Sequence, residues 1–241
     1  MVQAGREWNN ELDGKLKDHE YQHLTLDPCV YIQRDNSKFG ILAIWVNNPL
    51  LFASTDQMMD HMKDVLSSEW EVTNLGEPHK IVGIEVMCTN NSISISQQKY
   101  IENLLHKEDM LEANPVAMPM DLNIKLAPDL DNNKLNHSNL YAKLLGCLQF
   151  ISNSTRPDIS YAVNKLAAYT ANPGLQHHSA IKCILRYLAG TKTLGITYRN
   201  TPNETDNHNL FHGYADATFT NADDHKSTTG YVSLGSGGAI M

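Results

Sequence analysis

Short apolar runs of strand length, separated by turn-forming residues, recur through the first part of this 241-residue chain. Runs bounded by Asn, Gly and Ser are typical of antiparallel strands joined in hairpins. The expected strands cover residues 29–32, 41–46, 50–53, 81–87 and 93–96. The expected turns lie at Asn36-Ser37 together with Gly40, at Asn47-Asn48, and at Thr89-Asn90-Asn91. The pattern therefore predicts a series of β-hairpins.

Apolar residues at helical spacing predict helices between and after these hairpins. One covers residues 5–17, and the next follows a capping box in which Ser54 and Gln57 would satisfy each other's backbone donors. A third helix passes through residues 100–105, and three more follow residue 137, where Pro157 suits the first turn of the middle one. Hairpins mixed with helices predict an α+β fold.

Residues 118–137 are rich in Pro, Asp and Asn and show little apolar periodicity. A loop of roughly 20 residues is longer than compact domains usually contain, which predicts a domain edge or a functional flap. A short strand is expected near residues 194–198, a polar linker over 199–209, and further strands over 210–241.

Charge is unevenly distributed along a chain whose net charge is −8. This balance argues against a dedicated nucleic-acid-binding protein, because phosphate contacts require Lys and Arg. Residues 159–203 nevertheless contain no Asp or Glu. This acid-free stretch carries Lys165, Lys182, Arg186, Lys192 and Arg199. It is therefore either a phosphate-facing surface or a solvated helix face.

The cysteines and the apolar content indicate the cellular compartment. Cys29, Cys88, Cys147 and Cys183 are widely scattered with no CxxC pair, which favours buried thiols in a reducing compartment over disulfides or zinc ligands. No apolar run is long enough to span a membrane, and the first residues are too polar for a secretory signal. We expect an intracellular protein, either cytoplasmic or nuclear, with no membrane partner.

Sequence landmarks recur in order along nearly the whole chain. They are Gln3-Ala4-Gly5-Arg6 with Trp8, Asp27-Pro28-Cys29-Val30-Tyr31, Leu75-Gly76-Glu77, Gly83-Ile84-Glu85, Ser96-Gln97 with Tyr100, Thr155-Arg156-Pro157-Asp158, His177, Tyr187, Gly190-Thr191 and Gly213-Tyr214-Ala215-Asp216-Ala217. Each is weak alone, but their order resembles the reverse-transcriptase region of copia-type retrotransposon Pol polyproteins.

The resemblance implies a division of the chain into family segments. Residues 1–117 would be a partial palm and the start of the thumb, and 118–137 a linker. Residues 138–199 would be the helical thumb and connection, and 200–241 the N-terminal fragment of an RNase H-like domain. The implied fold is α+β, with palm β-hairpins, a helical region and an incomplete RNase H-like sheet.

One departure from the family pattern concerns catalysis. Such polymerases carry a Tyr-Val-Asp-Asp hairpin, and the equivalent here is Trp45-Val46-Asn47-Asn48. Two-metal nucleotidyl transfer needs anionic oxygen ligands for Mg²⁺, whereas Asn offers a neutral carbonyl. Asn tolerates a left-handed backbone, so Asn47 and Asn48 are expected to survive only as a turn. Pro49 is expected to remove one hydrogen-bond donor from the returning strand.

The other implied metal ligands are also incomplete. The family's first palm carboxylate is expected upstream of residue 1. Asp216 resembles the first of four RNase H carboxylates, and the other three are expected beyond residue 241; Asp223-Asp224 is read as a solvated turn. A single carboxylate cannot form a two-metal site, so no Mg²⁺ or other cofactor is expected to bind this chain.

The resemblance therefore implies a catalytically inactive reverse-transcriptase fragment. Weak binding to RNA–DNA or DNA duplex is expected through Lys182, Arg186, Lys192 and Arg199, although Cys183 stands where the family usually has Arg. The alternative is a non-catalytic protein-interaction module derived from a retroelement. Residues 39–46 are expected to form an exposed apolar sheet edge, through which chains would associate.

Overall fold

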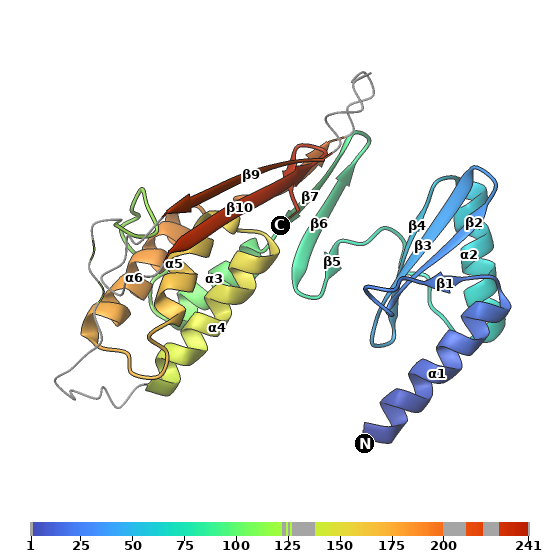
Figure 1. Cartoon of the computed structure of the whole chain (residues 1–241), viewed down its shortest axis with the longest axis horizontal. Coiled ribbons are helices and arrows are strands. Elements are labelled where there is room, and N and C mark those ends of the chain that lie inside the picture. The colour runs from blue at the N-terminus through green and yellow to red at the C-terminus, as the bar shows by residue number, and fades with distance from the viewer. Residues whose placement is uncertain are drawn as a thin grey trace. The chain divides into compact units, whose positions relative to one another are not determined.

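The computed structural model describes residues 2–121, 124, 126, 138–199, 211–218 and 227–240. The chain forms two compact units, Met1–Leu75 and Gly76–Met241, which we describe separately. Helices and antiparallel sheets occur in both units (Figure 1). The protein is therefore mixed α and β, which confirms the coarse part of the α+β prediction. The assignment of residues on either side of positions 117 and 118 to separate family segments stays a prediction.

The first unit contains one four-stranded antiparallel sheet and two helices. Helix α1 spans Val2–Asp18 and α2 spans Asp56–Glu69. The strands, in their spatial order, are β1 (Gln22–His23), β2 (Val30–Asp35), β3 (Lys38–Trp45) and β4 (Asn48–Ala53). Tyr31 and Leu42 pair directly across β2 and β3, so they lie on the same face of the sheet. The helices share a buried core with that face: Leu12, Leu16, Met58, Met62, Val65 and Leu66.

Gly40 lies inside β3, where the sequence predicted a turn. It pairs with Gln33 on one side and Ala53 on the other. A Cβ at this position would overlap Met62 Sδ, so the missing side chain lets α2 approach the sheet closely. The prediction of a turn at Gly40 was wrong, because Gly here serves close packing and Asn36-Ser37 alone form the turn.

The cap of α2 also differs from the predicted capping box. Thr55, rather than Ser54, is the N-cap, and its Oγ1 accepts a hydrogen bond from the Met58 N–H at 3.2 Å. Ser54 Oγ instead accepts from the Phe39 N–H at 2.9 Å. Both Ser54 and Thr55 could cap a helix. Because the hydroxyl of Ser54 bonds to the backbone near the start of β3, Thr55 caps α2.

The second unit contains a helical group and two sheets. Strands β5 (Lys80–Ile81), β6 (Ile84–Thr89), β7 (Ser92–Ser96) and β8 (Gly195–Arg199) form one sheet in that order. The helices are α3 (Gln98–Lys107), α4 (Ser138–Ser154), the short 3-10 turn η1 (Pro157–Ile159), α5 (Ser160–Ala167) and α6 (Leu175–Gly190). Strand β8 pairs with β7, which precedes it by about a hundred residues. The same sheet therefore contains the strand before α3 and the strand after α6.

Buried apolar side chains of α3, α4, α5 and α6 form one core. Its fully buried members include Ile101, Leu105, Tyr141, Leu148, Ile151, Ile159, Leu166, Ile184 and Leu188. Their spacing is the apolar periodicity from which these helices were predicted. Pro157 begins η1, which confirms its predicted place at a helix start.

A second sheet of this unit contains β9 (Phe211–Thr218), β10 (Thr228–Gly235) and β11 (Gly238–Ala239), in the order β11-β10-β9. It is joined to β8, because Tyr198 OH donates to the Ala239 carbonyl at 2.8 Å and the Arg199 N–H donates to the Ser236 carbonyl at 2.8 Å. Most of the predicted loop at 118–137 and the linker at 199–209 lie outside the described residues.

Three further expectations can be compared with the structure. Residues 39–46 are not a sheet edge, because β3 pairs with β2 on one side and β4 on the other. Cys29 and Cys88 are exposed rather than buried. Within the described part of the chain, no helix is both long and apolar enough to cross a membrane.

Candidate functional site

The β3–β4 hairpin carries Asn47 and Asn48, which the resemblance predicted to stand where the family has catalytic aspartates. Trp45 and Asn48 pair across its end, so Val46 and Asn47 are the two turn residues and Asn48 already belongs to β4. Val46, not an Asn, has the left-handed backbone, with φ of 59°. The prediction that Asn47-Asn48 make the turn was therefore wrong by one residue. Asn48 Nδ2 donates to Asn47 Oδ1 at 3.4 Å, and both side chains are exposed.

Pro49 does not disturb the ladder between β3 and β4. It lies opposite Ile44, whose N–H donates to the Cys29 carbonyl next to β2 at 2.9 Å. Backbone groups of Ile44 thus point away from β4, and the Ile44–Pro49 pair is one that exchanges no hydrogen bonds. The ring nitrogen of Pro49 faces the outer edge of the sheet, the usual place for Pro in a strand. The prediction of a lost ladder donor was wrong.

The hairpin tip does not fit a pair of Mg²⁺ ions. Asn47 and Asn48 present neutral amide oxygens, whereas hard divalent cations in two-metal sites are held by carboxylates. Within the described residues, no group of three or more His, Cys, Asp or Glu side chains is placed to hold a metal ion. The hairpin therefore ends in a tight turn whose side chains carry no negative charge.

A hollow of about 220 Å³ lies beside this hairpin, between α1 and the sheet. Its lining includes Trp8 and Gly5 of α1 and Tyr31 and Val46 from the sheet side. Trp8 Nε1 donates to the Val46 carbonyl at 3.4 Å, which ties the helix to the turn. Burial, and then the nearby Asp13 carboxylate, raise the pKa of Tyr31 to about 12. Sequence reasoning missed this hollow, although Gly5 and Trp8 were among the landmarks.

The structure places the four predicted duplex-binding cations in three different segments of the second unit. Lys182 and Arg186 are one turn apart on α6, and Arg186 Nε donates to the Asn114 carbonyl at 2.7 Å. Lys192 follows α6, with its Nζ 4.0 Å from Glu102 Oε1 of α3. Arg199 is the last residue of β8, at the end of the strand far from α6. Only Lys182 and Arg186 are therefore brought together on one helix face.

Asp216 lies in the middle of β9, opposite Gly230 of β10, and is exposed. Its Oδ1 accepts a hydrogen bond from the Ala217 N–H at 2.9 Å. Asp223-Asp224 lie outside the described residues. The described part of this sheet thus holds Asp216 as an isolated carboxylate.

The landmarks of the second unit converge on a polar cluster around the buried Arg156. Arg156, only 1% exposed, donates from Nε and Nη2 to both oxygens of Asp158 at 2.9 and 2.7 Å. Its guanidinium also reaches the Thr191 carbonyl and Oγ1, at 2.8 and 2.7 Å. Tyr187 OH donates to Asp158 Oδ2 at 2.8 Å. We name Arg156, Asp158, Tyr187 and Thr191 the arginine cluster.

The arginine cluster has a structural role with an electrostatic consequence. Burial alone would raise the pKa of Asp158, but hydrogen bonds from Arg156 and Tyr187 outweigh it and hold that pKa below its usual value. The bidentate Arg156–Asp158 pair lies within the turn after α4, and the bonds from Arg156 to Thr191 and from Tyr187 to Asp158 join this turn to the end of α6. Next to it, Thr155 Oγ1 donates to Gln97 Oε1 at 2.8 Å, which connects the start of α3.

His177, another landmark, caps α6. Its Nδ1 accepts a hydrogen bond from the Gly174 N–H at 2.8 Å, and its ring stacks on Tyr169 with centroids 4.2 Å apart. The imidazole is fully buried.

Sequence comparison identifies the class of protein to which these landmarks belong. A family model described as reverse transcriptase (RNA-dependent DNA polymerase) matches residues 1–122. The chain belongs to this reverse-transcriptase family.

The curated relatives place the chain within retrotransposon Pol polyproteins. It is 33% identical, over its whole length, to the retrovirus-related Pol polyprotein from transposon TNT 1-94 of Nicotiana tabacum. It is 32% identical over 96% of its length to the corresponding polyprotein from transposon RE2 of Arabidopsis thaliana. A putative Ty5-1 transposon protein of Saccharomyces cerevisiae is 26% identical over the whole chain and 77% of its own length. The resemblance to copia-type Pol polyproteins is confirmed.

The chain spans 18% of the Nicotiana polyprotein and 16% of the RE2 polyprotein. It therefore corresponds to one region of these much longer proteins. No solved structure matches it significantly.

Proposed function

We propose that this chain is a reverse-transcriptase region that does not transfer nucleotides and that binds nucleic-acid duplex weakly and without sequence preference. Residues 1–117 would correspond to palm and the start of the thumb, 138–199 to the helical thumb and connection, and 200–241 to the start of an RNase H-like domain. The family membership and the order of the landmarks support this assignment.

The observation that carries the lack of catalysis is the neutral hairpin tip. Asn47 and Asn48 occupy an exposed turn next to the hollow, where the family pattern has Asp-Asp. Catalysis by two metal ions relies on charge stabilisation, and an amide carbonyl in place of a carboxylate supplies none of the negative charge that holds the ions. The hairpin thus keeps a substrate-facing shape without the chemistry.

Primer extension tests the first part of the proposal. The full chain, given an RNA template, a DNA primer and labelled deoxynucleotides with Mg²⁺ or Mn²⁺, should incorporate no label above a heat-inactivated sample. Incorporation that depends on added metal and disappears on chelation would contradict it.

Duplex binding rests on the acid-free stretch, and above all on Lys182 and Arg186. Phosphate contacts release counterions, so affinity falls with salt in proportion to the number of contacts. If the four cations each neutralise a phosphate, log affinity should fall against log salt with a slope of about −3 to −4. Because Lys182 and Arg186 share one face of α6, replacing both with Ala should flatten the slope by about two units.

A matched control separates local contacts from net charge. Lys17→Ala with Lys80→Ala removes the same two charges from other exposed positions and should leave the slope unchanged. Fluorescence anisotropy of a labelled RNA–DNA hybrid over a salt series measures both. Equal effects of the two double variants would exclude a specific surface on α6.

A further inference from the structure

The imidazole of His177 caps α6 from inside the protein. His177 is the third helical residue after the N-cap Gly174, and its side chain is fully buried. A Glu or Gln at this position commonly reaches back and accepts a hydrogen bond from the N-cap N–H, as one half of a capping box. His177 Nδ1 does the same, because it accepts from the Gly174 N–H at 2.8 Å. The cap is therefore made by the residue type that changes its charge nearest to neutral pH.

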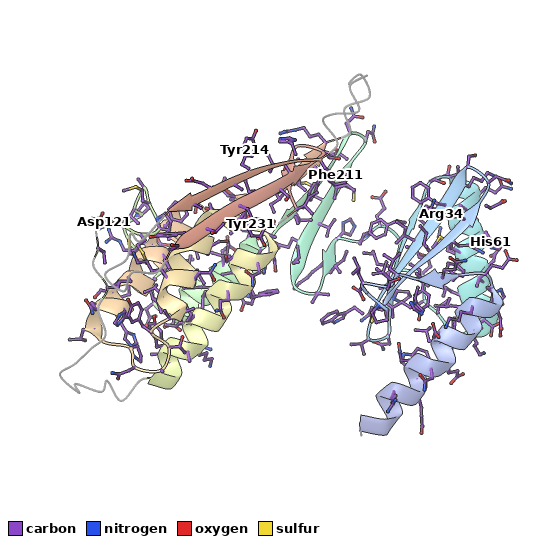
Figure 2. All side chains as sticks on the ribbon, in the orientation of Figure 1. Arg34, His61, Asp121, Phe211, Tyr214 and Tyr231 are labelled. Atoms are coloured by element: carbon purple, nitrogen blue, oxygen red, sulfur yellow. The ribbon has the colours of Figure 1, made fainter. Side chains whose placement is uncertain are left out.

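This hydrogen bond fixes the charge of the ring. A ring nitrogen that accepts a hydrogen bond carries no proton, so the contact exists only while the imidazole of His177 is neutral. Protonation would turn Nδ1 into a donor that faces the Gly174 N–H. Gly174 is itself buried, so its N–H would lose its acceptor away from water. An exposed histidine such as His61, on α2, takes up a proton in contact with water instead (Figure 2).

Among the described residues, two tyrosines and a second histidine are the titratable groups packed beside His177. Tyr169, in the turn after α5, stacks on its ring with centroids 4.2 Å apart. The ring of the neighbouring His178 meets that of Tyr141, on α4, with centroids 5.2 Å apart. Phenols stay neutral at mildly acidic pH, and burial raises the pKa of Tyr141 to about 12. None of these groups supplies a negative charge to a protonated His177.

We propose that His177 is an acid-sensitive cap, which holds the first turn of α6 closed at neutral pH and releases it on protonation. The turn between α5 and α6 would open with it, because Gly174 and Tyr169 both lie in that turn. Tyr169 OH also donates to the Leu126 carbonyl at 2.8 Å, so this attachment loosens together with the turn. The acid-sensitive cap is independent of nucleotide transfer and of the duplex binding proposed above.

The opposite end of α6 is held by groups that keep their charge in mild acid. Arg156 donates to the Thr191 carbonyl and Oγ1, just after the helix. The pKa of its partner Asp158 is held below its usual value, so this carboxylate stays ionised. Ile184 and Leu188 are fully buried in the same part of α6. Acid should therefore open the helix at its first turn, and the last turn serves as an internal reference.

Hydrogen–deuterium exchange of the full chain, corrected for the direct effect of pH on exchange chemistry, measures the opening of each turn. The N–H groups of His177 and His178 donate to the Gly174 carbonyl and report on the first turn. Their opening equilibrium should rise at least about tenfold between about pH 7 and 5, because opening takes up one proton. The last turn, residues 187–190, should change by less than about threefold.

His177→Gln separates the titration from the cap. Gln can accept the same hydrogen bond from the Gly174 N–H but does not titrate. The pH dependence of the first turn should disappear, while its opening at about pH 7 stays within about threefold of wild type. His106→Gln removes an exposed histidine of the same unit, at the end of α3. This matched control should keep the wild-type pH dependence.

Nuclear magnetic resonance of the wild-type ring gives a second measurement that needs no variant. Long-range proton–nitrogen correlation should show His177 Nδ1 without a proton at about pH 6, where exposed histidines are mostly protonated. A His177 ring that titrates together with exposed histidines while the first turn stays closed would overturn the proposal. So would equal opening of the first and last turns in acid, or a wild-type pH dependence in the His177→Gln variant.

Discussion

Arg156 is the side chain on which the polar contacts of the second unit converge. It is 1% exposed, whereas its partner Asp158 retains 36% of its side-chain exposure. The guanidinium lies 5.5 Å from the Tyr187 ring centroid as well as bonding to Asp158 and Thr191. Few other residues could replace it, because Lys lacks the planar fork that serves both a carboxylate and two oxygens of Thr191.

Arg156→Ala should lower the free energy of unfolding by about 2–4 kcal/mol, since it leaves the partly buried Asp158 without its counter-charge. Urea denaturation followed by far-ultraviolet circular dichroism measures the change. Arg199→Ala, an exposed arginine of the same unit, should change it by less than about 0.5 kcal/mol. A loss below about 1 kcal/mol for Arg156→Ala would show that the cluster is not a stabilising element.

The lowered pKa of Asp158 makes its contribution depend on pH. The folded pKa lies below the unfolded value of about 3.9, so the stabilisation is fully present above that value. It is lost as the pH falls through the folded pKa, because the carboxyl group then becomes protonated and the ion pair disappears.

Asp158→Asn should remove this dependence. The difference in unfolding free energy between wild type and variant should be constant at neutral pH and should shrink below about pH 4. Urea titrations at several pH values measure it. If the difference instead grows with acidification, the pKa of Asp158 is raised rather than lowered.

At the scale of the element, the β3–β4 hairpin carries backbone strain at an unusual residue. Val46 has φ of 59° although it is β-branched, and its side chain is 72% exposed. Hairpins with a positive φ at the first turn position usually have Gly there. The Trp8 contact to the Val46 carbonyl and the packing beside the hollow help to hold the turn.

Val46→Gly should stabilise the first unit by about 0.5–1 kcal/mol, because relief of the left-handed strain exceeds the added freedom of the unfolded chain. Tryptophan fluorescence during urea denaturation measures this unit, since Trp8, Trp45 and Trp70 all lie in it. Asn47→Gly relieves no positive φ and should give no gain. Destabilisation by Val46→Gly would mean that side-chain packing outweighs the strain.

Sequence patterns predicted the helices and strands well, because apolar periodicity reflects which side of each element is buried. They failed where two explanations share one residue type. Gly40 was read as a turn but leaves room for Met62, and Ser54 was read as a cap that Thr55 provides. Pro49 was predicted to remove a hydrogen-bond donor from the sheet. Its nitrogen points to the outer edge instead, which only the register of the strands reveals. The hollow depends on packing of α1 against distant strands and has no local signal.

The whole molecule consists of two units with separate sheets and separate cores. Every strand pairing of the first unit lies before residue 76, and so does its buried core. In the second unit, β7 pairs with β8, and Thr155 bonds to Gln97. These contacts cross residues 117 and 118, where the family segments were expected to divide. The physical boundary of the described structure therefore lies at Leu75–Gly76.

Dividing the chain at the two boundaries should give different results. Residues 1–75 should show cooperative unfolding by tryptophan fluorescence, with only a few kcal/mol of stability because so small a unit buries little surface. Residues 76–241 should keep a cooperative helical transition by circular dichroism. Residues 118–241 lack β7 and α3, which exposes one edge of β8 and part of the helical core, so their transition should be broad or absent. Equal cooperativity of the 76–241 and 118–241 fragments would show that β7 and α3 contribute little to the stability of the helical core.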